Sequence, residues 1–415
     1  MDAQPSSTSD VISSLPKDVI DTILKLLPIK DAVRTSMLSR KWRYAWTTLP
    51  RLVFTDKQLP ELKTNIVKIM DQVLSRHMGT VVKFHLSTRL HDVPDLDRWI
   101  SILCDKGVQE FIFKLDWGAP YIVPSTLFSC ESLKYLKLSN CTISIPLEFR
   151  AFDMLTYLHL SGVNFVDDGL QNLLSKCPHL TNLSLIGIYC RTFLKILAPN
   201  LETFWFSGTF RDLYFEKTPN LTDVHIYLID SIPSLNIGVQ DRRVPDLMRA
   251  LHHLGSIETL GLCGYALKFL LIGTVQESLN LTCSHLKTLR LSLNFEDMKG
   301  TAAVLRLLRD CPFLQELEIM TDSNQVTAML PIGNYWEMVQ YSDCSFNHLH
   351  EVRMISFSAA EPELEFMKYI LANATVLETL DLWPADEILE DPEVLKEMLT
   401  FQRASKHAAI IWHDP

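Results

Sequence analysis

The chain has 415 residues, of which 47% are hydrophobic and 21% are charged, and this composition excludes disordered and collagen-like proteins. Its length exceeds the roughly 100–200 residues of one ordinary domain, so it predicts two or three units or a long repeat fold. The net charge of −10 at pH 7 disfavours general nucleic-acid binding, because a surface that binds phosphates must be basic.

The amino-terminal residues 1–9 are polar and are predicted to be disordered. They lack the cationic and apolar regions of a signal peptide, and no uninterrupted apolar run in the sequence approaches the roughly 18–20 residues that cross a bilayer. We therefore expect a protein of the nucleus and/or the cytoplasm that makes no membrane contact.

Residues 10–54 form a short basic segment with a wide apolar helical face. Eight Lys or Arg stand against four Asp, which gives the segment a charge of +4. A first helix is predicted to end at Pro28, and its apolar residues cover an arc of roughly 160°: Val19, Ile20, Ile23, Leu24, Leu26 and Leu27. The stretches KDAVRTSML and SRKWRYAW predict two further helices. A three-helix unit of this size is near the lower limit for independent stability, so it should pack on something else.

The order of residues in this segment resembles the F-box in its plant form, which carries two Leu-Pro pairs, an acidic residue, Ala-Val, Leu-Ser and Trp-Arg. The resemblance implies that one side of the unit binds an acidic Skp-family adaptor and, through it, a cullin; the positive charge suits such a partner. It also implies a set of adaptor-binding residues: Leu15, Pro16, Asp18, Ile20, Ile23, Leu27, Pro28, Val33, Leu38 and Trp42. The alternatives are a helical cap that packs only on its own chain and a basic-aromatic patch for nucleic acid.

Residues 80–330 repeat an apolar-x-x-apolar-x-apolar pattern, which is the signature of leucine-rich repeats. Twelve strands are predicted from its copies, including weaker ones at both ends, and these copies begin at Val81, Val108, Leu133, Leu155, Leu180, Leu201, Leu221, Ile257, Leu286, Leu314, Leu349 and Leu377. Amphipathic segments such as TAAVLRLLRDCPFL separate the copies. The fold class expected is therefore α/β, a right-handed solenoid with one strand and one helix in each repeat, carried behind the three-helix F-box.

The intervening strand residues should face the concave surface in rows, where aromatic residues would anchor a protein partner. The candidates for binding a target protein are Tyr135, Lys137, Tyr157, His159, Trp205 and His225. The long insert at residues 229–246 is also expected at a binding face. Cys177 and Cys311 occupy equivalent places before Pro and are predicted to be core residues.

Residues 335–415 are similar to the FBD region that follows the repeats in many plant F-box proteins, with Trp336, Cys344, Leu349 and the run ILANATVLETL. We expect this region to continue the solenoid and to cap its last edge, with RASKHAAIIW as a terminal strand. Nine Cys without a C-x-x-C pair argue against a disulfide framework or a zinc ribbon, so we predict reduced, buried thiols.

No nucleotide-binding, hydrolase or metalloprotease motif is present, which indicates a non-catalytic protein without cofactor or metal. The function predicted is substrate recognition within a Skp-cullin-F-box (SCF) ubiquitin ligase, with an unknown target protein as partner. Two alternatives stay open: a small-molecule co-receptor, and a scaffold that binds the adaptor without ubiquitin transfer. The co-receptor would need a basic cluster, and Lys137, Arg290 and Arg353 are expected to lie far apart.

Overall fold

The computed structural model describes residues 11–56, 66–89, 95–115, 118–166, 168–190, 193–229, 247–252, 254–267, 285–321, 346–385 and 392–413. Residues 1–9, nearly all of the insert at 229–246, and the start of the FBD-like region with Trp336 and Cys344 lie outside these ranges. The chain divides into two compact units, Met1–Ser184 and Leu185–Pro415. Each unit is built on a parallel sheet.

The first unit opens with short helices that are punctuated by proline. They are α1 (Val11–Ser14), α2 (Lys17–Leu26), α3 (Ile29–Arg34), and the 3-10 turns η1 (Thr35–Met37) and η2 (Ala45–Thr48). Pro16 and Pro28 stand immediately before α2 and α3 in extended backbone. Proline has no backbone N–H, and an N–H group at a helix start has no partner within the helix, so no hydrogen bond is lost there. The third α-helix expected over SRKWRYAW is wrong, because residues 40–44 are turns and only η2 follows. Leu49 precedes Pro50, which disfavours helix there.

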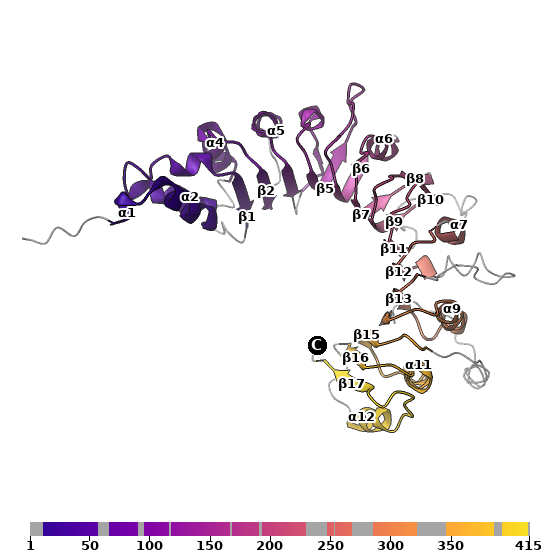
Figure 1. The fold of residues 1–415 in the computed structure, drawn as a ribbon. Coiled ribbons are helices and arrows are strands. Elements are labelled where there is room, and N and C mark those ends of the chain that lie inside the picture. Colours follow the sequence, from indigo (N-terminus) through magenta and orange to yellow (C-terminus); the bar gives the residue numbers. More distant parts are fainter. Residues whose placement is uncertain are drawn as a thin grey trace, which may run out of the picture. The chain divides into compact units, whose positions relative to one another are not determined.

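The sheet of the first unit has the strand order β1-β2-β3-β5-β6, and β4 pairs with β5. Its strands are β1 (Arg51–Thr55), β2 (Lys83–Thr88), β3 (Glu110–Leu115), β4 (Tyr121–Ile122), β5 (Tyr135–Ile143) and β6 (Tyr157–Phe165). Between them run α4 (Ile66–Arg76), α5 (Leu96–Asp105), η4 (Ser125–Ser129) and α6 (Gly169–Ser175). Helices α4 and α5 lie on one side of these strands (Figure 1). We call the opposite side of each sheet its open face.

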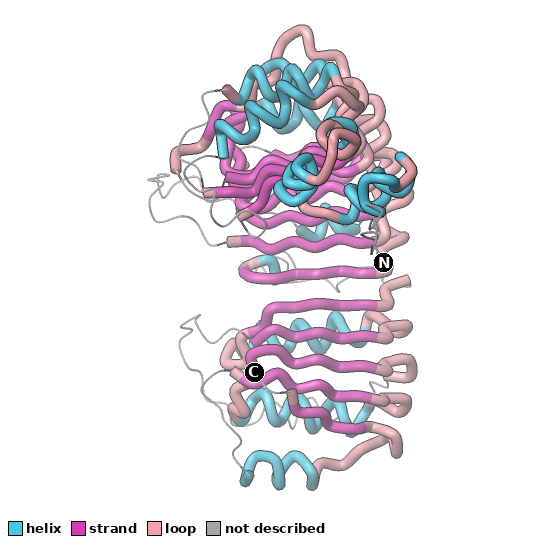
Figure 2. The backbone as a smooth tube through the Cα atoms, turned by 90° about the vertical axis from the view of Figure 1, so that its left-hand side faces the viewer, coloured by secondary structure: helices cyan, strands magenta, loops and turns pink. Residues whose placement is uncertain are grey.

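The second unit continues the same plan. Its strands are β7 (Asn182–Tyr189), within which the chain leaves the first unit, β9 (Thr203–Thr209), β11 (Asp223–Leu228), β12 (Thr259–Gly264), β13 (Thr288–Leu293), β14 (Glu316–Thr321), β15 (Glu351–Phe357), β16 (Thr379–Pro384) and β17 (Ala409–Trp412). The helices are α7 (Leu247–His252), α9 (Met298–Arg309), α11 (Glu361–Asn373) and α12 (Pro392–Leu399). From β9 onward these strands pair in chain order, as a ladder that ends near the carboxyl terminus in Figure 2.

All twelve predicted strands are present, each beginning two residues after the first apolar residue of its repeat. In the repeat of β5, for example, Leu133, Leu136 and Leu138 are buried, and Leu136 stands opposite Leu158 of β6. Burying one such side chain stabilises the fold by about 1.5–3 kcal/mol, so the repeated Leu positions hold the stack together. Cys177 and Cys311 are core residues, as predicted.

Two features of the repeats were not predicted. Strand β1 precedes the first predicted repeat and pairs in parallel with β2. A separate two-stranded parallel sheet, β8 (Phe193–Leu197) with β10 (Asp212–Glu216), stands where helices were expected. Burial alternates along both strands, with Leu194 and Ile196 buried in β8 and Leu213 and Phe215 in β10, which suits a half-buried strand and not a helix. The terminal strand expected in RASKHAAIIW is confirmed as β17, which pairs with β16.

One cysteine pair corrects the expectation of reduced thiols. Cys104, in the last turn of α5, forms a disulfide with Cys130, which follows η4 in the next repeat, and their Cα atoms are 5.0 Å apart. The two cysteines lie 26 residues apart along the chain, in adjacent repeats, so no C-x-x-C pair marks them in the sequence. Among the described residues, five further cysteines form no disulfide: Cys141, Cys177, Cys190, Cys263 and Cys311.

Candidate protein-binding surfaces

The inner side of the helical segment forms a small core of its own. Ile20 and Leu24 of α2 are buried, together with Trp42 and Trp46. The indole N–H of Trp42 donates to the carbonyl of Ile12 at 3.1 Å, which ties α1 to the turns that follow η1. Ile20 and Trp42 were predicted to bind the adaptor; both side chains are buried in the small core that holds the helices together, and adaptor contact through them stays a prediction.

The outer side of the same segment exposes large apolar groups. Leu26 is 82% exposed, Met37 89% and Leu38 50%. The eight other predicted adaptor-binding residues are exposed or half-buried: Leu15, Pro16, Asp18, Ile23, Leu27, Pro28, Val33 and Leu38. Exposed apolar groups that the prediction missed lie beside them: Val11, Ile12, Val19, Leu26, Met37 and Tyr44. Apolar side chains gathered at one surface indicate an interaction site.

Backbone hydrogen bonds seat the helical segment on the first repeat. The carbonyl of Thr47 accepts from the backbone N–H of Met78 at 2.8 Å, and Nε2 of the buried His77 lies 2.8 Å from the carbonyl of Leu49. Burial lowers the pKa of His77, so its ring is neutral and carries the donated proton on Nε2. The amine of Lys106 donates to the carbonyl of His77 at 2.7 Å. The helices are therefore held at the start of the repeats.

A groove of about 240 Å³ separates α3 from α4. Its apolar lining is Ile29, Val33, Trp46, Phe54, Ile69 and Val73, and its polar lining is Lys30, Arg34, Gln72 and Arg76. Val33, one of the predicted adaptor-binding residues, faces this groove and not a flat outer surface. The groove is thus lined by the helical segment, strand β1 and helix α4.

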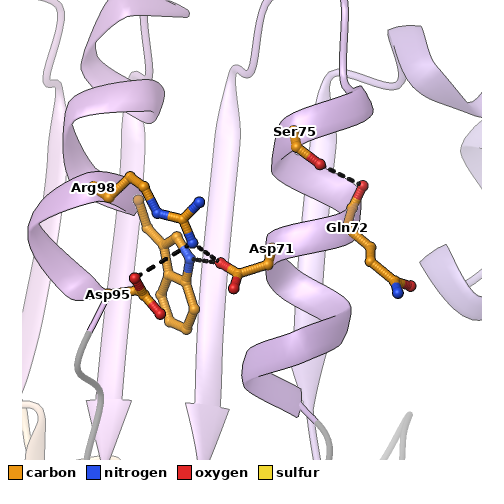
Figure 3. A network of polar contacts seen from close by, with 6 residues as sticks. Asp71, Gln72, Ser75, Asp95 and Arg98 are labelled. Carbon is orange, nitrogen blue, oxygen red and sulfur yellow. Dashed lines mark hydrogen bonds and ion pairs between the residues drawn. The ribbon is translucent and has the colours of Figure 1, made fainter.

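A polar network locks α4 to α5 on the helix-covered side (Figure 3). One carboxylate oxygen of Asp71 accepts from the indole N–H of the buried Trp99 and from Arg98, both at 2.5 Å. Arg98 also lies 3.4 Å from Asp95, and Ser75 donates to the carbonyl of Gln72 one turn earlier. The contacts of Asp71 with Arg98 and Trp99 therefore connect α4 to α5.

The open face of the first unit brings four predicted partner-binding residues together. The rings of Tyr135 and Tyr157 stack with centroids 4.2 Å apart and planes 7° apart. Lys137 stands opposite His159 in the next row. Burial and the Tyr157 hydroxyl raise the pKa of Tyr135 to about 12, while burial and the charge of Lys137 lower the pKa of His159 to about 4. At neutral pH the Tyr135 phenol and the His159 imidazole are uncharged.

The open face of the second unit holds the other two candidates, of which one is exposed and one is buried. Trp205 is exposed and its ring lies 4.2 Å from that of His225. His225 itself is only 8% exposed, because its ring fills the space beside Gly261, where an added Cβ would come within 2.2 Å of Nδ1. Its Nε2 lies 2.8 Å from Asp223 and 3.4 Å from Arg290. Partner contact through His225 stays a prediction; in this structure its ring supports Trp205.

Arg290 and Arg353 are closer than expected. Both lie near the same Glu318 carboxylate oxygen, at 3.6 and 3.7 Å, from the strands on either side of β14. Arg353 also pairs with Glu351 at 2.5 Å. Their charges are balanced by these carboxylates, so they do not make a free basic cluster of the kind that a small anionic ligand would need.

Comparison with known proteins agrees with this architecture. The F-box domain family matches residues 12–54, and the LRR domain family described as At1g61320/AtMIF1 matches residues 73–393. The F-box/FBD/LRR-repeat protein At1g13570 of Arabidopsis thaliana is 33% identical, over 97% of this chain and 98% of its own length. The chain belongs to the plant F-box/FBD/LRR-repeat family.

Other members of the family are similar over nearly their whole length. The Arabidopsis F-box/FBD/LRR-repeat protein At5g56420 is 26% identical over 98% of this chain and 99% of its own. The FBD-associated F-box protein At4g10400, from the same plant, is 24% identical over 95% and 98%. The names of At1g13570 and At5g56420 give an F-box, an FBD and leucine-rich repeats in one chain.

Neither matched domain is enzymatic. Within the described ranges, His, Cys, Asp and Glu side chains form no group of three or more that would hold a metal. Of the helices placed there, none combines the length and the apolar character that a membrane span needs. The surfaces of this F-box/FBD/LRR-repeat protein are its candidate functional sites.

The sequence carried signals for the features that were missed. Strand β1 follows the repeat pattern itself, with Leu49, Leu52 and Phe54 all buried at the repeat spacing. This pattern was hidden because it overlaps the end of the F-box. Met37 and Leu26 stand next to predicted F-box positions, and a helical wheel that separated the buried Leu24 from its neighbours would have found Leu26.

Proposed function

We propose that this protein is the substrate-recognition subunit of an SCF ubiquitin ligase, in which the F-box binds a Skp-family adaptor, and through it a cullin, while the repeats bind a target protein. The observation that carries the proposal is the apolar outer surface of the F-box, above all Leu26, Met37 and Leu38. Covering one such side chain contributes up to about 1.5–3 kcal/mol toward binding, against the entropic cost of association.

The charge of the segment supports the same partner. Residues 10–54 carry +4 in a chain of net charge −10, so the basic residues gather where an acidic adaptor would bind. The eight surface residues from Leu15 to Leu38 that the sequence indicated would surround the exposed apolar groups. Ile20 and Trp42 would act indirectly, by fixing the positions of α1, α2 and α3.

The proposed mechanism is proximity. One end of the chain holds the ligase and the rest holds a target, so a target lysine stays near the charged ubiquitin carrier at high effective concentration. No nucleophile of this chain takes part. We assign residues 10–54 to the F-box, 80–330 to the repeats and 335–415 to an FBD-like cap, behind a disordered 1–9, and we expect the complex in the nucleus and/or the cytoplasm.

The test is co-purification of the full chain with a Skp-family adaptor, using Met37→Asp and Leu38→Asp. Both side chains are exposed, so the fold should persist, while a charge placed in a covered apolar contact should weaken binding about ten-fold or more. Leu399→Asp, at an equally exposed leucine of α12, is the matched control and should bind normally. Unchanged binding by both F-box variants would overturn the proposal.

Ubiquitin transfer separates this function from a scaffold. The assembled complex should modify a captured target in vitro, and the Met37→Asp complex should not. A chain that binds the adaptor but supports no transfer to any captured partner would be a scaffold instead.

A further inference from the structure

Two cysteines of the first unit come together at the junction of α5 and η4. Cys104 lies in the last turn of α5, and Cys130 directly follows η4 in the next repeat. Their Cα atoms are 5.0 Å apart, within the roughly 4.4–6.8 Å that a disulfide spans. The register of the repeats fixes this approach, because the strands that follow α5 and η4, β3 and β5, pair in parallel. The two thiols can therefore bond or separate without a large backbone movement.

The two sulfur atoms differ in their access to small solutes. Cys130 is only 2% exposed, whereas Cys104 is half-buried. Thiol–disulfide exchange needs an approach to the sulfur that reacts, so a small thiol or disulfide from solution reaches Cys104 first. Redox-sensing cysteines are accessible and lie next to a second cysteine that resolves the first product. Cys104 and Cys130 have this arrangement.

The thiols elsewhere in the described ranges are poorly suited to the same reaction. Burial raises the pKa of Cys141 and Cys177 to about 12, and that of Cys190 to about 11. These thiols stay protonated at neutral pH, and the thiolate is the form that attacks a disulfide. Oxidation should therefore select the pair of Cys104 and Cys130.

The pair lies next to the contacts that seat the F-box. Lys106, two residues after Cys104, donates through its amine to the carbonyl of His77 at 2.7 Å. Nε2 of His77 lies in turn 2.8 Å from the carbonyl of Leu49. A bond from Cys104 to Cys130 ties the last turn of α5 to the next repeat, so it steadies the end of the helix from which Lys106 reaches this seat.

We propose that Cys104 and Cys130 are a reversible modification site, which low-molecular-weight disulfides oxidise and dithiols reduce. The Cys104 thiolate attacks one sulfur of the small disulfide, which forms a mixed disulfide and releases one small thiolate. The Cys130 thiolate then attacks the Cys104 sulfur, which closes the protein disulfide and releases the second small thiolate. The two protons of the protein thiols pass to the two released thiolates. Two protein thiols are thus oxidised and one small disulfide is reduced.

The second step is favoured because it takes place within one chain, where the two reacting groups are held close together. The nucleus and the cytoplasm, where we expect this protein, keep most thiols reduced, and disulfides there are usually transient. The bond would therefore form under oxidation and open again when reducing conditions return.

The test follows the thiols of the full chain with glutathione. The reduced protein is exposed to oxidised glutathione, the remaining thiols are alkylated, and its peptides are analysed by mass spectrometry. We expect one disulfide, between Cys104 and Cys130, which dithiothreitol opens again while the protein stays folded. The oxidised protein should melt about 2 °C or more above the reduced one, and its amides in α5 and η4 should exchange more slowly.

Two variants separate the roles of the cysteines. In Cys130→Ser the mixed disulfide has no resolving thiol, so glutathione should stay bound to Cys104. In Cys104→Ser the remaining Cys130 should stay unmodified, because it is buried. Cys190→Ser is the matched control, since Cys190 is half-buried like Cys104 but forms no disulfide. This control should oxidise as the wild type does.

Three results on the wild-type chain would overturn the inference. They are no bond between Cys104 and Cys130 in excess oxidised glutathione, a bond that dithiothreitol opens only after unfolding, and preferential modification of Cys141, Cys177 or Cys190. Glutathione bound to Cys130 in the Cys104→Ser variant would also contradict it, and circular dichroism checks that both variants fold. The inference does not rest on the proposed function, because neither an adaptor nor a target protein takes part in the test.

Discussion

At the scale of single residues, the packing on the open face of the second unit depends on one neighbour, Gly261, that lacks a side chain. His225 lies flat beside Gly261 because that position leaves room for its ring, and Trp205 then rests against the imidazole. A reading of one strand at a time cannot find this arrangement, because the empty space belongs to a strand 36 residues further on. The register of the sheet, not the local sequence, decides that Trp205 is exposed and His225 is buried.

Gly261→Ala tests that packing. The added Cβ would come within 2.2 Å of Nδ1 of His225, so the ring must move, and we expect a loss of about 1–3 kcal/mol in the free energy of unfolding. Chemical denaturation measures it. Gly255→Ala is the control, since nothing lies within 4 Å of its added Cβ. Equal stability of Gly261→Ala and the wild type would contradict the packing described.

Lys137→Gln tests the effect of the Lys137 charge on the pKa of His159. With the cation removed, the pKa of His159 should rise from about 4 toward its ordinary value but stay below it, because burial is the larger cause. The unfolded chain protonates this histidine first, near pH 6.5, so it makes stability fall as the pH drops from about 6.5 to about 4. Titration of the imidazole resonances by NMR measures the pKa. No change in the variant would show that Lys137 does not act on His159.

At the scale of helices and strands, the repeat pattern predicted the strands well, and the segments that connect them were predicted less well. The spacing of Leu133, Leu136 and Leu138 specifies a strand because every third or second residue must be buried, and the same rule placed all twelve predicted strands. Strand β1 was missed because its residues also complete the F-box pattern. Strands β8 and β10 were missed because a helix was expected there, and because the sequence of β8, FLKIL, does not alternate apolar and polar residues although its burial alternates.

The candidate surfaces were predicted less completely than the strands. Leu38 and Pro16 could be placed at the surface from the family pattern, but Ile20 and Trp42 share that pattern for structural reasons. Resemblance identifies which residues matter and does not distinguish a residue that contacts a partner from one that positions its neighbours. Burial makes that distinction, and only coordinates supply it.

Asp71→Ala tests the support between α4 and α5. The buried indole N–H of Trp99 would lose its acceptor, which costs about 1–3 kcal/mol, and Arg98 would lose its nearer carboxylate. Thermal or chemical unfolding of the full chain measures the loss. Asp95→Ala, which removes only the 3.4 Å contact with Arg98, should cost less than about 1 kcal/mol. A cost for Asp95→Ala as large as that for Asp71→Ala would contradict the roles assigned here.

At the scale of the whole molecule, each part has a separate task. The F-box keeps a small core of its own, with Leu24 and Trp46, and leaves Leu26 and Met37 uncovered. The buried rows of the sheets stabilise each unit. The strands of the first unit contain more cations than carboxylates, and those of the second contain more carboxylates than cations.

Hydrogen–deuterium exchange of the full chain, with and without a Skp-family adaptor, tests the central claim most directly. The adaptor should slow exchange at the backbone amides between Val11 and Leu38, because that surface becomes covered, and should leave the amides of β2–β6 unchanged. Protection confined to the sheet strands, or no protection anywhere at saturating adaptor, would contradict the account.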